Sequence, residues 1–296
     1  MAWVQISLYA REEDAETYSD CLTASGAVAV TFEDAEDKPL FEPLPGTTPL
    51  WHKTRVIGLY DADVNVSSIK KFIKKQLGNE ALQQLEVNTL AEKNWTRAWM
   101  DQFQPMRFGQ KLMICPTHIP IPDPNAINII LDPGMAFGTG THPTTRLCLE
   151  WLDQHPPENL VVIDYGCGSG ILGIAALKLG ASFIYAIDHD PQALESTKSN
   201  AKQNGYDELK IKTVLPNEFQ PAEKVDLILA NILANPLLEL APLFTELLRA
   251  GGTLVLSGIL ENQTNSIIER YQDAFSEFNV VKIDGWSLIY AIKTMS

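Results

Sequence analysis

Residues 161–173 read VVIDYGCGSGILG, a strand that is apolar almost throughout, then three closely spaced glycines, then the start of an apolar helix. A strand this apolar is typical of a parallel sheet buried between two layers of helices. From residue 144 onward similar strands alternate with helices, and two adjacent strands, residues 280–284 and 286–293, follow. This pattern predicts an α/β domain with a doubly wound, Rossmann-like, mostly parallel sheet. Its ligand is expected at the carboxyl ends of the strands.

The first ninety residues predict a second, smaller domain with the element order β-α-β-β-α-β. The expected strands are residues 3–10, 27–34, 55–61 and 82–91, and the expected helices are residues 14–26 and 66–78. The second helix is expected to end at Gly78, because glycine commonly terminates helices. This order is that of ferredoxin-like α+β domains.

The chain of 296 residues is long enough for two domains. We predict a ferredoxin-like domain over residues 1–92, a linker helix over 93–104 and the α/β domain over 105–296. Within the linker, Trp95, Trp99 and Phe103 recur at the spacing of one helix face.

The net charge of −14 constrains the partner. Nucleic-acid-binding proteins usually carry a basic face, so no direct nucleic-acid contact is expected. An acidic protein suits a basic partner, and the first 50 residues hold ten acidic residues against Arg11 and Lys38. The chain has neither an apolar run long enough to span a bilayer nor a signal-like N-terminus, so no membrane contact and a cytoplasmic location are expected. A monomer is expected because no long apolar stripe is evident.

The four cysteines, Cys21, Cys115, Cys148 and Cys167, are widely spaced. No C-x-x-C pair occurs, and the C-x-x-H spacing of Cys115 and His118 lacks a second pair of ligands. We therefore expect no metal site.

Two interpretations of the glycine-rich segment compete. GSGILG fits the G-x-G-x-x-G fingerprint of dinucleotide-binding folds, whereas D-x-G-x-G-x-G, starting at Asp164, fits the first motif of S-adenosylmethionine-dependent methyltransferases. Both need an acidic residue after the second strand to hold a ribose, and Asp188 is in that place. Asp190 is expected to cap the following helix, which leaves Asp188 free for the ribose.

Other residues favour S-adenosylmethionine. The carboxylate of Asp164 suits the ammonium of its methionine part better than a pyrophosphate. Asn231 ends the fourth strand and resembles the Asn/Asp-Pro-Pro-aromatic motif of amino methyltransferases. The chain departs from that motif, because Ile232, Leu233 and Ala234 follow Asn231. Without an aromatic platform, flexible aliphatic amines fit better than planar bases.

The loop LDPGMAFGTGTHPTT, residues 131–145, resembles a phosphate-binding loop but has no lysine. Backbone N–H groups and threonine hydroxyls at a helix start can bind a carboxylate, whereas a lysine would repel a sulfonium. We predict that this loop is a lid, mobile without the cofactor and ordered with it. His142, next to Pro143, is either a general base or a helix cap.

Several segments together resemble the family of methyltransferases that act on large-subunit ribosomal protein eleven. They are the 131–145 loop, the VIDYGCGSG motif, Asp188, ANILANPL, GAVAVTFED, FEPLPG and NWTRAWMDQFQPMRFG, and they cover nearly the whole chain. The resemblance implies a class I methyltransferase with S-adenosylmethionine as cofactor and S-adenosylhomocysteine as product. It implies methylation of lysine side chains and the N-terminal amine of that ribosomal protein, up to trimethylation. The alternatives are another small basic protein or a small amine as substrate and, less favoured, a nicotinamide oxidoreductase.

The resemblance also implies roles for individual residues. Thr145 binds the methionine end of the cofactor, Gly166 allows a close approach of the backbone, and Asp188 holds the ribose. Asn231 contacts the cofactor and is the catalytic residue at the methyl-transfer site. The remaining residues of the expected cofactor site are Asp164, Gly168, Thr141 and Phe137. The acidic first domain is expected to dock the substrate, with the linker as a hinge.

Overall fold

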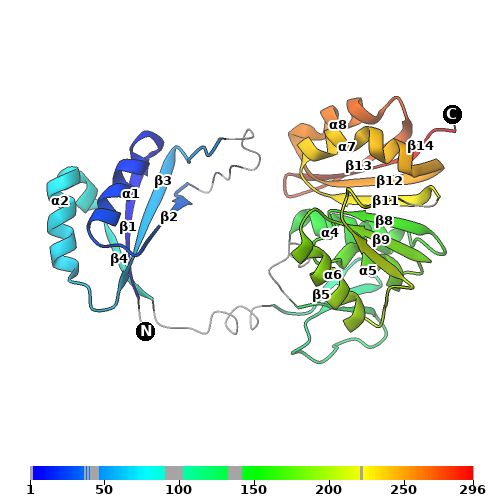
Figure 1. Ribbon diagram of the computed structural model, residues 1–296, viewed down its shortest axis with the longest axis horizontal. Helices are drawn as coiled ribbons and strands as arrows, with labels where there is room; N and C mark the ends of the chain where they lie inside the picture. The colour runs from blue at the N-terminus through cyan, green and yellow to red at the C-terminus, as the bar shows by residue number, and fades with distance from the viewer. Residues whose placement is uncertain are drawn as a thin grey trace. The chain divides into compact units, whose positions relative to one another are not determined.

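The computed structural model describes residues 3–36, 38, 40, 47–90, 103–132, 142–220 and 223–295. Contacts divide the chain into two compact units, Met1–Ala98 and Trp99–Ser296 (Figure 1). The predicted linker helix lies outside the described residues except for Phe103 and Gln104. Phe103 is buried in the core of the second unit.

The first unit is an antiparallel sheet of four strands in the order β2-β3-β1-β4, with two helices. Its elements are β1 (Trp3–Arg11), η1 (Glu12–Asp14), α1 (Ala15–Ala24), β2 (Ala29–Asp34), β3 (Lys53–Asp61), α2 (Val66–Gln83) and β4 (Glu86–Leu90). Val4, Ile6 and Leu8 alternate along β1 and pack with both helices in one core, as period-2 alternation requires. The ferredoxin-like prediction is confirmed.

One helix boundary differs from the prediction. Gly78 has φ 88° and ψ −173° and interrupts α2, but a further helical segment continues to Gln83. The residues after Gly78, NEALQ, include good helix formers, and Ala81 among them is buried in the core. The last strand therefore begins at Glu86 and not at residue 82.

The second unit is built on a seven-stranded sheet in the order β10-β9-β8-β11-β12-β14-β13. Its strands are β8 (Val161–Tyr165), β9 (Phe183–Ile187), β10 (Ile211–Val214), β11 (Val225–Asn231), β12 (Leu248–Leu260), β13 (Phe275–Ile283) and β14 (Trp286–Lys293). Among these described strands, β14 alone runs in the direction opposite to the others.

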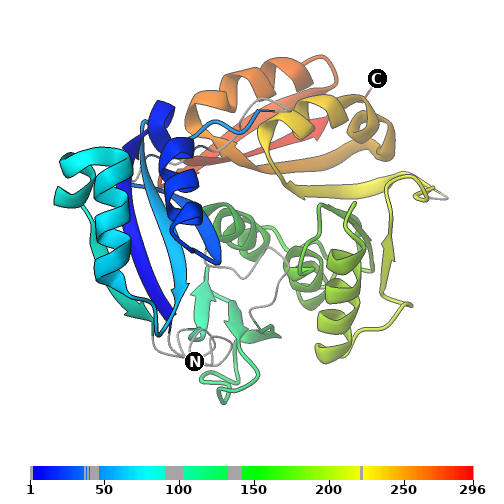
Figure 2. The ribbon, with the colours of Figure 1, turned by 60° about the vertical axis from the view of Figure 1, so that its left-hand side comes forward.

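Helices cover both faces of this sheet (Figure 2). One layer contains α4 (Pro143–Gln154), α5 (Ile171–Lys178) and α6 (Pro191–Gln203), and the other contains α7 (Ala234–Leu247), η2 (Glu261–Gln263) and α8 (Thr264–Tyr271). Each layer has its own apolar core against the sheet. The predicted doubly wound sheet is confirmed.

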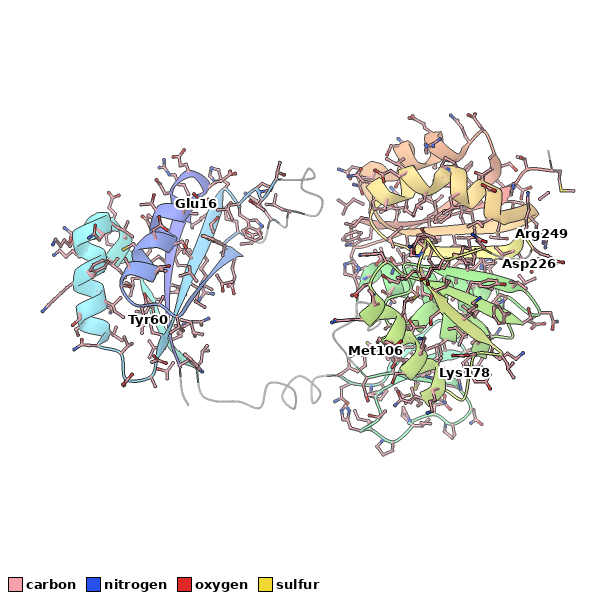
Figure 3. All side chains as sticks on the ribbon, in the orientation of Figure 1. Glu16, Tyr60, Met106, Lys178, Asp226 and Arg249 are labelled. Atoms are coloured by element: carbon pink, nitrogen blue, oxygen red, sulfur yellow. The ribbon has the colours of Figure 1, made fainter. Side chains whose placement is uncertain are left out.

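Asp226 ties three strands of this sheet together at their amino ends. Its carboxylate accepts the Val161 N–H of β8 (2.8 Å) and pairs with Arg249 of β12 (2.5 Å; Figure 3). The central parallel strands are thereby held in register at the end opposite the predicted ligand.

None of the described helices is long and apolar enough to cross a membrane.

A small three-stranded sheet packs against α4 and α5. It consists of β5 (Met106–Phe108), β6 (Leu112–Cys115) and β7 (Ile127–Ile130). The buried carboxylate of Asp153, near the end of α4, accepts the backbone N–H groups of Gln110 (2.8 Å), Lys111 (2.8 Å) and Leu112 (3.2 Å). One side chain therefore fixes the β5–β6 turn to the helix.

Replacing Asp153 with alanine is expected to lower the free energy of unfolding by about 2 kcal/mol, because buried N–H groups lose a charged acceptor. Urea unfolding followed by tryptophan fluorescence measures this loss. Asp273→Ala, at an exposed position of the same unit, is the control and is expected to stay within about 0.5 kcal/mol of the wild type. Equal stability of the two variants would contradict the role given to Asp153.

Candidate active site

Three neighbouring strands bring predicted site residues to one edge of the sheet. Gly166 follows β8, Asp188 follows β9, and Asn231 ends β11; these strands are adjacent and parallel. The Gly166 N–H donates to the Ile187 carbonyl (2.7 Å), which joins the first two strand ends. The predicted location at the carboxyl ends of the strands therefore gathers these residues as expected.

The contacts of Asp188 and Asp190 correct one expectation. Asp190 caps α6 by accepting the Gln192 N–H (2.8 Å), as predicted. Asp188 is not free: its Oδ2 accepts the Gly168 N–H (2.9 Å) and its Oδ1 accepts the Asp190 N–H (3.0 Å). A carboxylate has about four acceptor positions, so Asp188 can hold the glycine loop and still accept from further donors.

Two polar residues of α6 also hold the glycine loop, and the sequence reasoning missed them. Thr197 is fully buried and donates to the Gly168 carbonyl (3.1 Å), while Asn200 donates to the Ser169 carbonyl (2.8 Å). Asn204, one turn further, exchanges two hydrogen bonds with the backbone of Ile130 (2.9 and 2.7 Å). Their spacing of three and four residues places them on one helix face, which is the signal that could have revealed them.

Asn231 is linked to the start of α4. Its Nδ2 donates to the hydroxyl of Thr145 (3.3 Å), a fully buried residue in the first turn of that helix. Its Oδ1 is buried and has no hydrogen-bond partner among the described residues. Since buried polar atoms are nearly always paired, this oxygen marks a place where a donor from a ligand fits.

His142 serves as the N-cap of α4. Its Nδ1 accepts from the Thr144 N–H (3.3 Å) and contacts the Thr144 hydroxyl (2.7 Å), and its ring packs edge-on against Trp286 (4.8 Å between centroids). Burial lowers the pKa of His142 below its ordinary value, which favours the neutral ring. A neutral ring that accepts at Nδ1 carries its proton on Nε2. Of the two predicted roles, the geometry favours the cap.

Asp164 lies beneath the glycine loop and is only 1% exposed. Its Oδ2 accepts the Gly173 N–H of α5 (2.8 Å). Burial raises the pKa of Asp164 to about 7; the Gly173 hydrogen bond opposes this shift and the charge of Asp188 adds to it. The carboxyl group is thus poised to change protonation near neutral pH.

The remaining predicted residues, Thr141 and Phe137, lie outside the described residues, as does most of the predicted lid. Gly168, by contrast, is described, and its N–H donates to the carboxylate of Asp188. No group of three or more metal-binding side chains occurs in the part of the chain that the structure describes.

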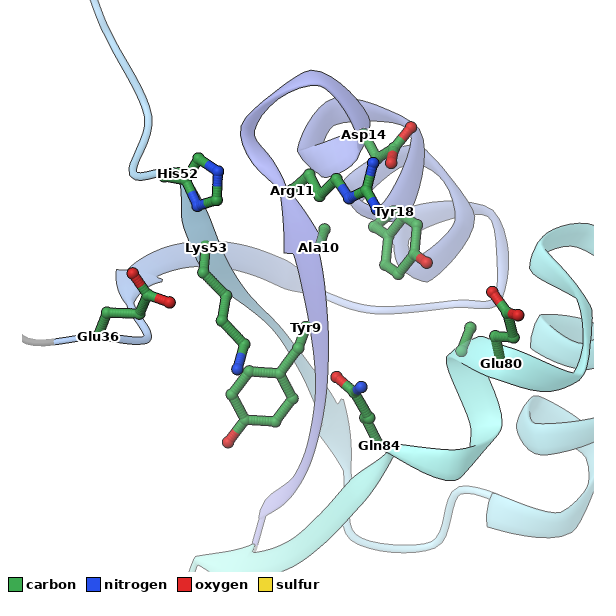
Figure 4. A pocket seen from close by; sticks show the side chains of 11 residues that line it. Tyr9, Ala10, Arg11, Asp14, Tyr18, Glu36, His52, Lys53, Glu80 and Gln84 are labelled. Carbon is green, nitrogen blue, oxygen red and sulfur yellow. The ribbon is translucent and has the colours of Figure 1, made fainter.

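The first unit contains a separate cavity of about 400 Å³ (Figure 4). It is lined by basic, acidic and aromatic side chains, among them Tyr9, Arg11, Asp14, Tyr18, Lys53 and Glu80. The Lys53 ammonium lies over the Tyr9 ring (5.7 Å to its centroid). Because positive and negative side chains both line the cavity, its charge favours neither an anionic nor a cationic ligand.

A family model described as ribosomal protein L11 methyltransferase (PrmA) matches residues 2–294. The chain belongs to this family. The match includes every predicted site residue and nearly all of both units. Of the two interpretations of the glycine segment, the methyltransferase one is confirmed, with S-adenosylmethionine as its cofactor.

Individual relatives agree with this assignment. A ribosomal protein L11 methyltransferase of Hydrogenovibrio crunogenus is 48% identical over 100% of both chains, and one of Escherichia coli is 49% identical over 98% of both. The crystal structure of a ribosomal protein L11 methylase from Lactobacillus delbrueckii subsp. bulgaricus is 31% identical and has a TM-score of 0.59. It matches over 65% of this chain and 100% of that one.

The pKa of Asp164 makes cofactor binding a test of its predicted role. If the cofactor's ammonium lies near this carboxylate, binding lowers the pKa of Asp164 from about 7 and releases a fraction of a proton at pH 6.5. At pH 8.5 the group is already ionised, so release is expected to vanish. Calorimetry of S-adenosylmethionine binding in buffers of different ionisation enthalpy measures the proton count.

The Asp164→Asn variant is the control, because it has no proton to release at this site. Equal proton release by this variant and the wild type at pH 6.5 would assign the release to another group. Absence of release in the wild type would place the ammonium away from Asp164.

Proposed function

We propose that this chain transfers methyl groups from S-adenosylmethionine to lysine side chains and the N-terminal amine of ribosomal protein L11, up to trimethylation. The observation that carries this proposal is the buried, unpartnered Oδ1 of Asn231, at a strand end in a chain of the L11 methyltransferase family. An amide oxygen there accepts an N–H of an incoming amine.

The described residues fit the cofactor. Asp188 keeps acceptor positions for the ribose hydroxyls, Gly166 follows the neighbouring strand β8, and Thr145 of α4 contacts Asn231 at the end of β11. Gly168 and Asp164 complete the described part of the site. Thr141 and Phe137 are proposed to contribute from the 131–145 loop. When bound, S-adenosylmethionine supplies a methyl group on a cationic sulfur that needs no further activation.

The protein's part in the reaction is to present an amine with a free lone pair. A lysine amine with a pKa near 10.4 is mostly protonated at pH 7, and desolvation in the site disfavours that charged form. The neutral oxygen of Asn231 accepts one N–H, which fixes the direction of the lone pair. His142 is occupied as a helix cap, so the proton leaves to solvent and no dedicated base is needed.

The residues after Asn231 fit an aliphatic acceptor. Ile232, Leu233 and Ala234 provide no aromatic platform, and Leu233 is 45% exposed beside the site. An exposed aliphatic side chain suits the methylene stem of lysine.

We further propose that residues 1–92 dock the basic substrate, that residues 93–104 act as the hinge, and that residues 105–296 carry out the transfer. The acidic charge and the absence of an aromatic platform favour a protein and not a nucleic acid as substrate. A monomer acting in the cytoplasm is the simplest arrangement for modifying a ribosomal protein.

Incubation of the enzyme with tritiated S-adenosylmethionine and total ribosomal protein tests this proposal. Label is expected in L11, with intact-mass spectra showing up to three added methyl groups per modified amine. Label confined to ribosomal RNA, or to proteins other than L11, would contradict it. Replacing Glu12, Glu13 and Glu16 with lysine is expected to raise KM for L11, while an unchanged KM would argue against docking on this part of the first unit.

A further inference from the structure

Ile232, the residue directly after Asn231, is held between two glycines. A Cβ atom on Gly166, which follows β8, would lie 2.3 Å from the Ile232 Cγ2. A Cβ atom on Gly258, within β12, would lie 2.2 Å from the Ile232 carbonyl oxygen and 2.7 Å from its carbon. Since β11 lies between β8 and β12, the two glycines form a slot that closes on Ile232 from both sides.

The backbone of β12 is irregular where it forms this slot. Gly258 has φ 85°, a conformation that side chains other than glycine rarely adopt. The pairing of β12 with β14 shifts register between Leu256 and Ile259, which marks a bulge around Gly258. At Gly258 the contact is thus between backbone and backbone, which yields less readily than a flexible side chain, whereas Gly166 faces the side chain of Ile232.

Helix α7 does not hold the Ile232 carbonyl. The helical i→i−4 hydrogen bond to this oxygen would come from the N–H of residue 236, which is a proline and has none. The next donor, the Leu237 N–H, bonds to the Leu233 carbonyl (3.3 Å). The position of the peptide after Asn231 is therefore set not by the helix but by the pairing of Asn231 with Ser257 of β12 and by packing against Gly258.

We infer that Gly258 is a positioning residue for the methyl-acceptor site: by fixing the Ile232 peptide it sets the direction in which Asn231 presents Oδ1 to the amine. This inference rests on the proposed function, because it concerns the same oxygen. It adds a residue on β12 to a site otherwise formed by β8, β9, β11 and α4. Displacing the Ile232 peptide displaces the acceptor oxygen and leaves the ribose side at Asp188 in place.

The test compares Gly258→Ala with Gly205→Ala. Gly205 also has φ 85°, but a Cβ atom there would meet no atom within 4 Å, so the control carries the same backbone strain without the contact. For Gly258→Ala we expect kcat on L11 to fall about 10- to 100-fold, the effect of misplacing a reacting group by a fraction of an ångström to an ångström. The Kd for S-adenosylmethionine, measured by calorimetry, is expected to equal that of Gly205→Ala within about two-fold.

Equal kcat for the two variants would overturn the inference, as would a parallel loss of cofactor affinity in Gly258→Ala. If Gly258→Ala does not fold, the Ile232→Ala variant is measured instead. This substitution removes the side chain from the slot at a half-buried position and introduces no backbone strain. An unchanged kcat of Ile232→Ala would overturn the inference. If the wild-type enzyme leaves L11 unlabelled, the proposed function itself is refuted. Failure of the proposed function is therefore distinguishable from failure of the positioning role of Gly258.

Discussion

Replacing Asn231 with alanine is expected to lower the rate of methyl transfer to L11 about 100-fold or more in single-turnover measurements. The variant loses the one amide oxygen that is buried without a partner in the described site, and with it the acceptor that we propose orients the amine. It also loses the 3.3 Å hydrogen bond to Thr145, which ties β11 to the start of α4. Cofactor affinity is expected to fall less than the rate, because Asp188 and the glycine loop remain.

Asn231→Asp sharpens this test. The variant keeps acceptor oxygens but removes the donor to Thr145 and adds a charge beside the cofactor's cation, so partial activity and altered pH dependence are expected. Asn279→Ala, at an exposed position of β13 with only a local hydrogen bond, is the control and should retain wild-type rates. Full activity of Asn231→Ala would remove this residue from the transfer step.

The strand ends of the site were predictable because parallel strands share a carboxyl edge. Once residues 161–165, 183–187 and 225–231 are recognised as apolar strands, Gly166, Asp188 and Asn231 must lie near one another, whatever the details of the turns. The cap of α6 was predictable for a different reason: Asp190 before Pro191 indicates a helix start from neighbouring residues alone.

Contacts between distant elements were not predictable from these patterns. The spacing of Thr197 and Asn200 places them on one helix face, but it does not say what that face contacts, and only the packing of α6 on the glycine loop shows that they point inward. The slot around Ile232 depends on β12 lying next to β11, which the residues around Gly258 do not indicate. The partners of Asp188 and Asp164 were missed because each is a backbone N–H, which every non-proline residue provides.

The lid predicted for residues 131–145 stays a prediction. The structure describes the residues on either side of the loop. On one side the carboxylate of Asp132 accepts the N–H and the hydroxyl of Thr117, and on the other His142 caps the start of α4. Hydrogen exchange of the enzyme with and without S-adenosylmethionine tests the lid, since equal protection of residues 133–141 in both states would contradict it.

Replacing Asp188 with alanine is expected to weaken S-adenosylmethionine binding about 100-fold, measured by calorimetry. Two contributions add. The proposed hydrogen bonds from ribose hydroxyls to this nearly buried carboxylate are lost, each contributing about 1.5–3 kcal/mol. The Gly168 N–H also loses its acceptor at 2.9 Å, so the glycine loop is less well held before the cofactor arrives.

Asp190→Ala separates these contributions from simple loss of a helix cap. Asp190 lies two residues away and caps α6 through the Gln192 N–H, and its own backbone N–H, which Asp188 accepts, is retained in the variant. This control is expected to lose about 1 kcal/mol of stability with little change in cofactor affinity. If both variants bound the cofactor equally weakly, the effect would belong to the start of α6, and the ribose contact assigned to Asp188 would have to be given up. A large loss of affinity in Asp188→Ala alone would place the carboxylate at the cofactor, because the two variants differ in which side chain can reach a ligand at the end of β9.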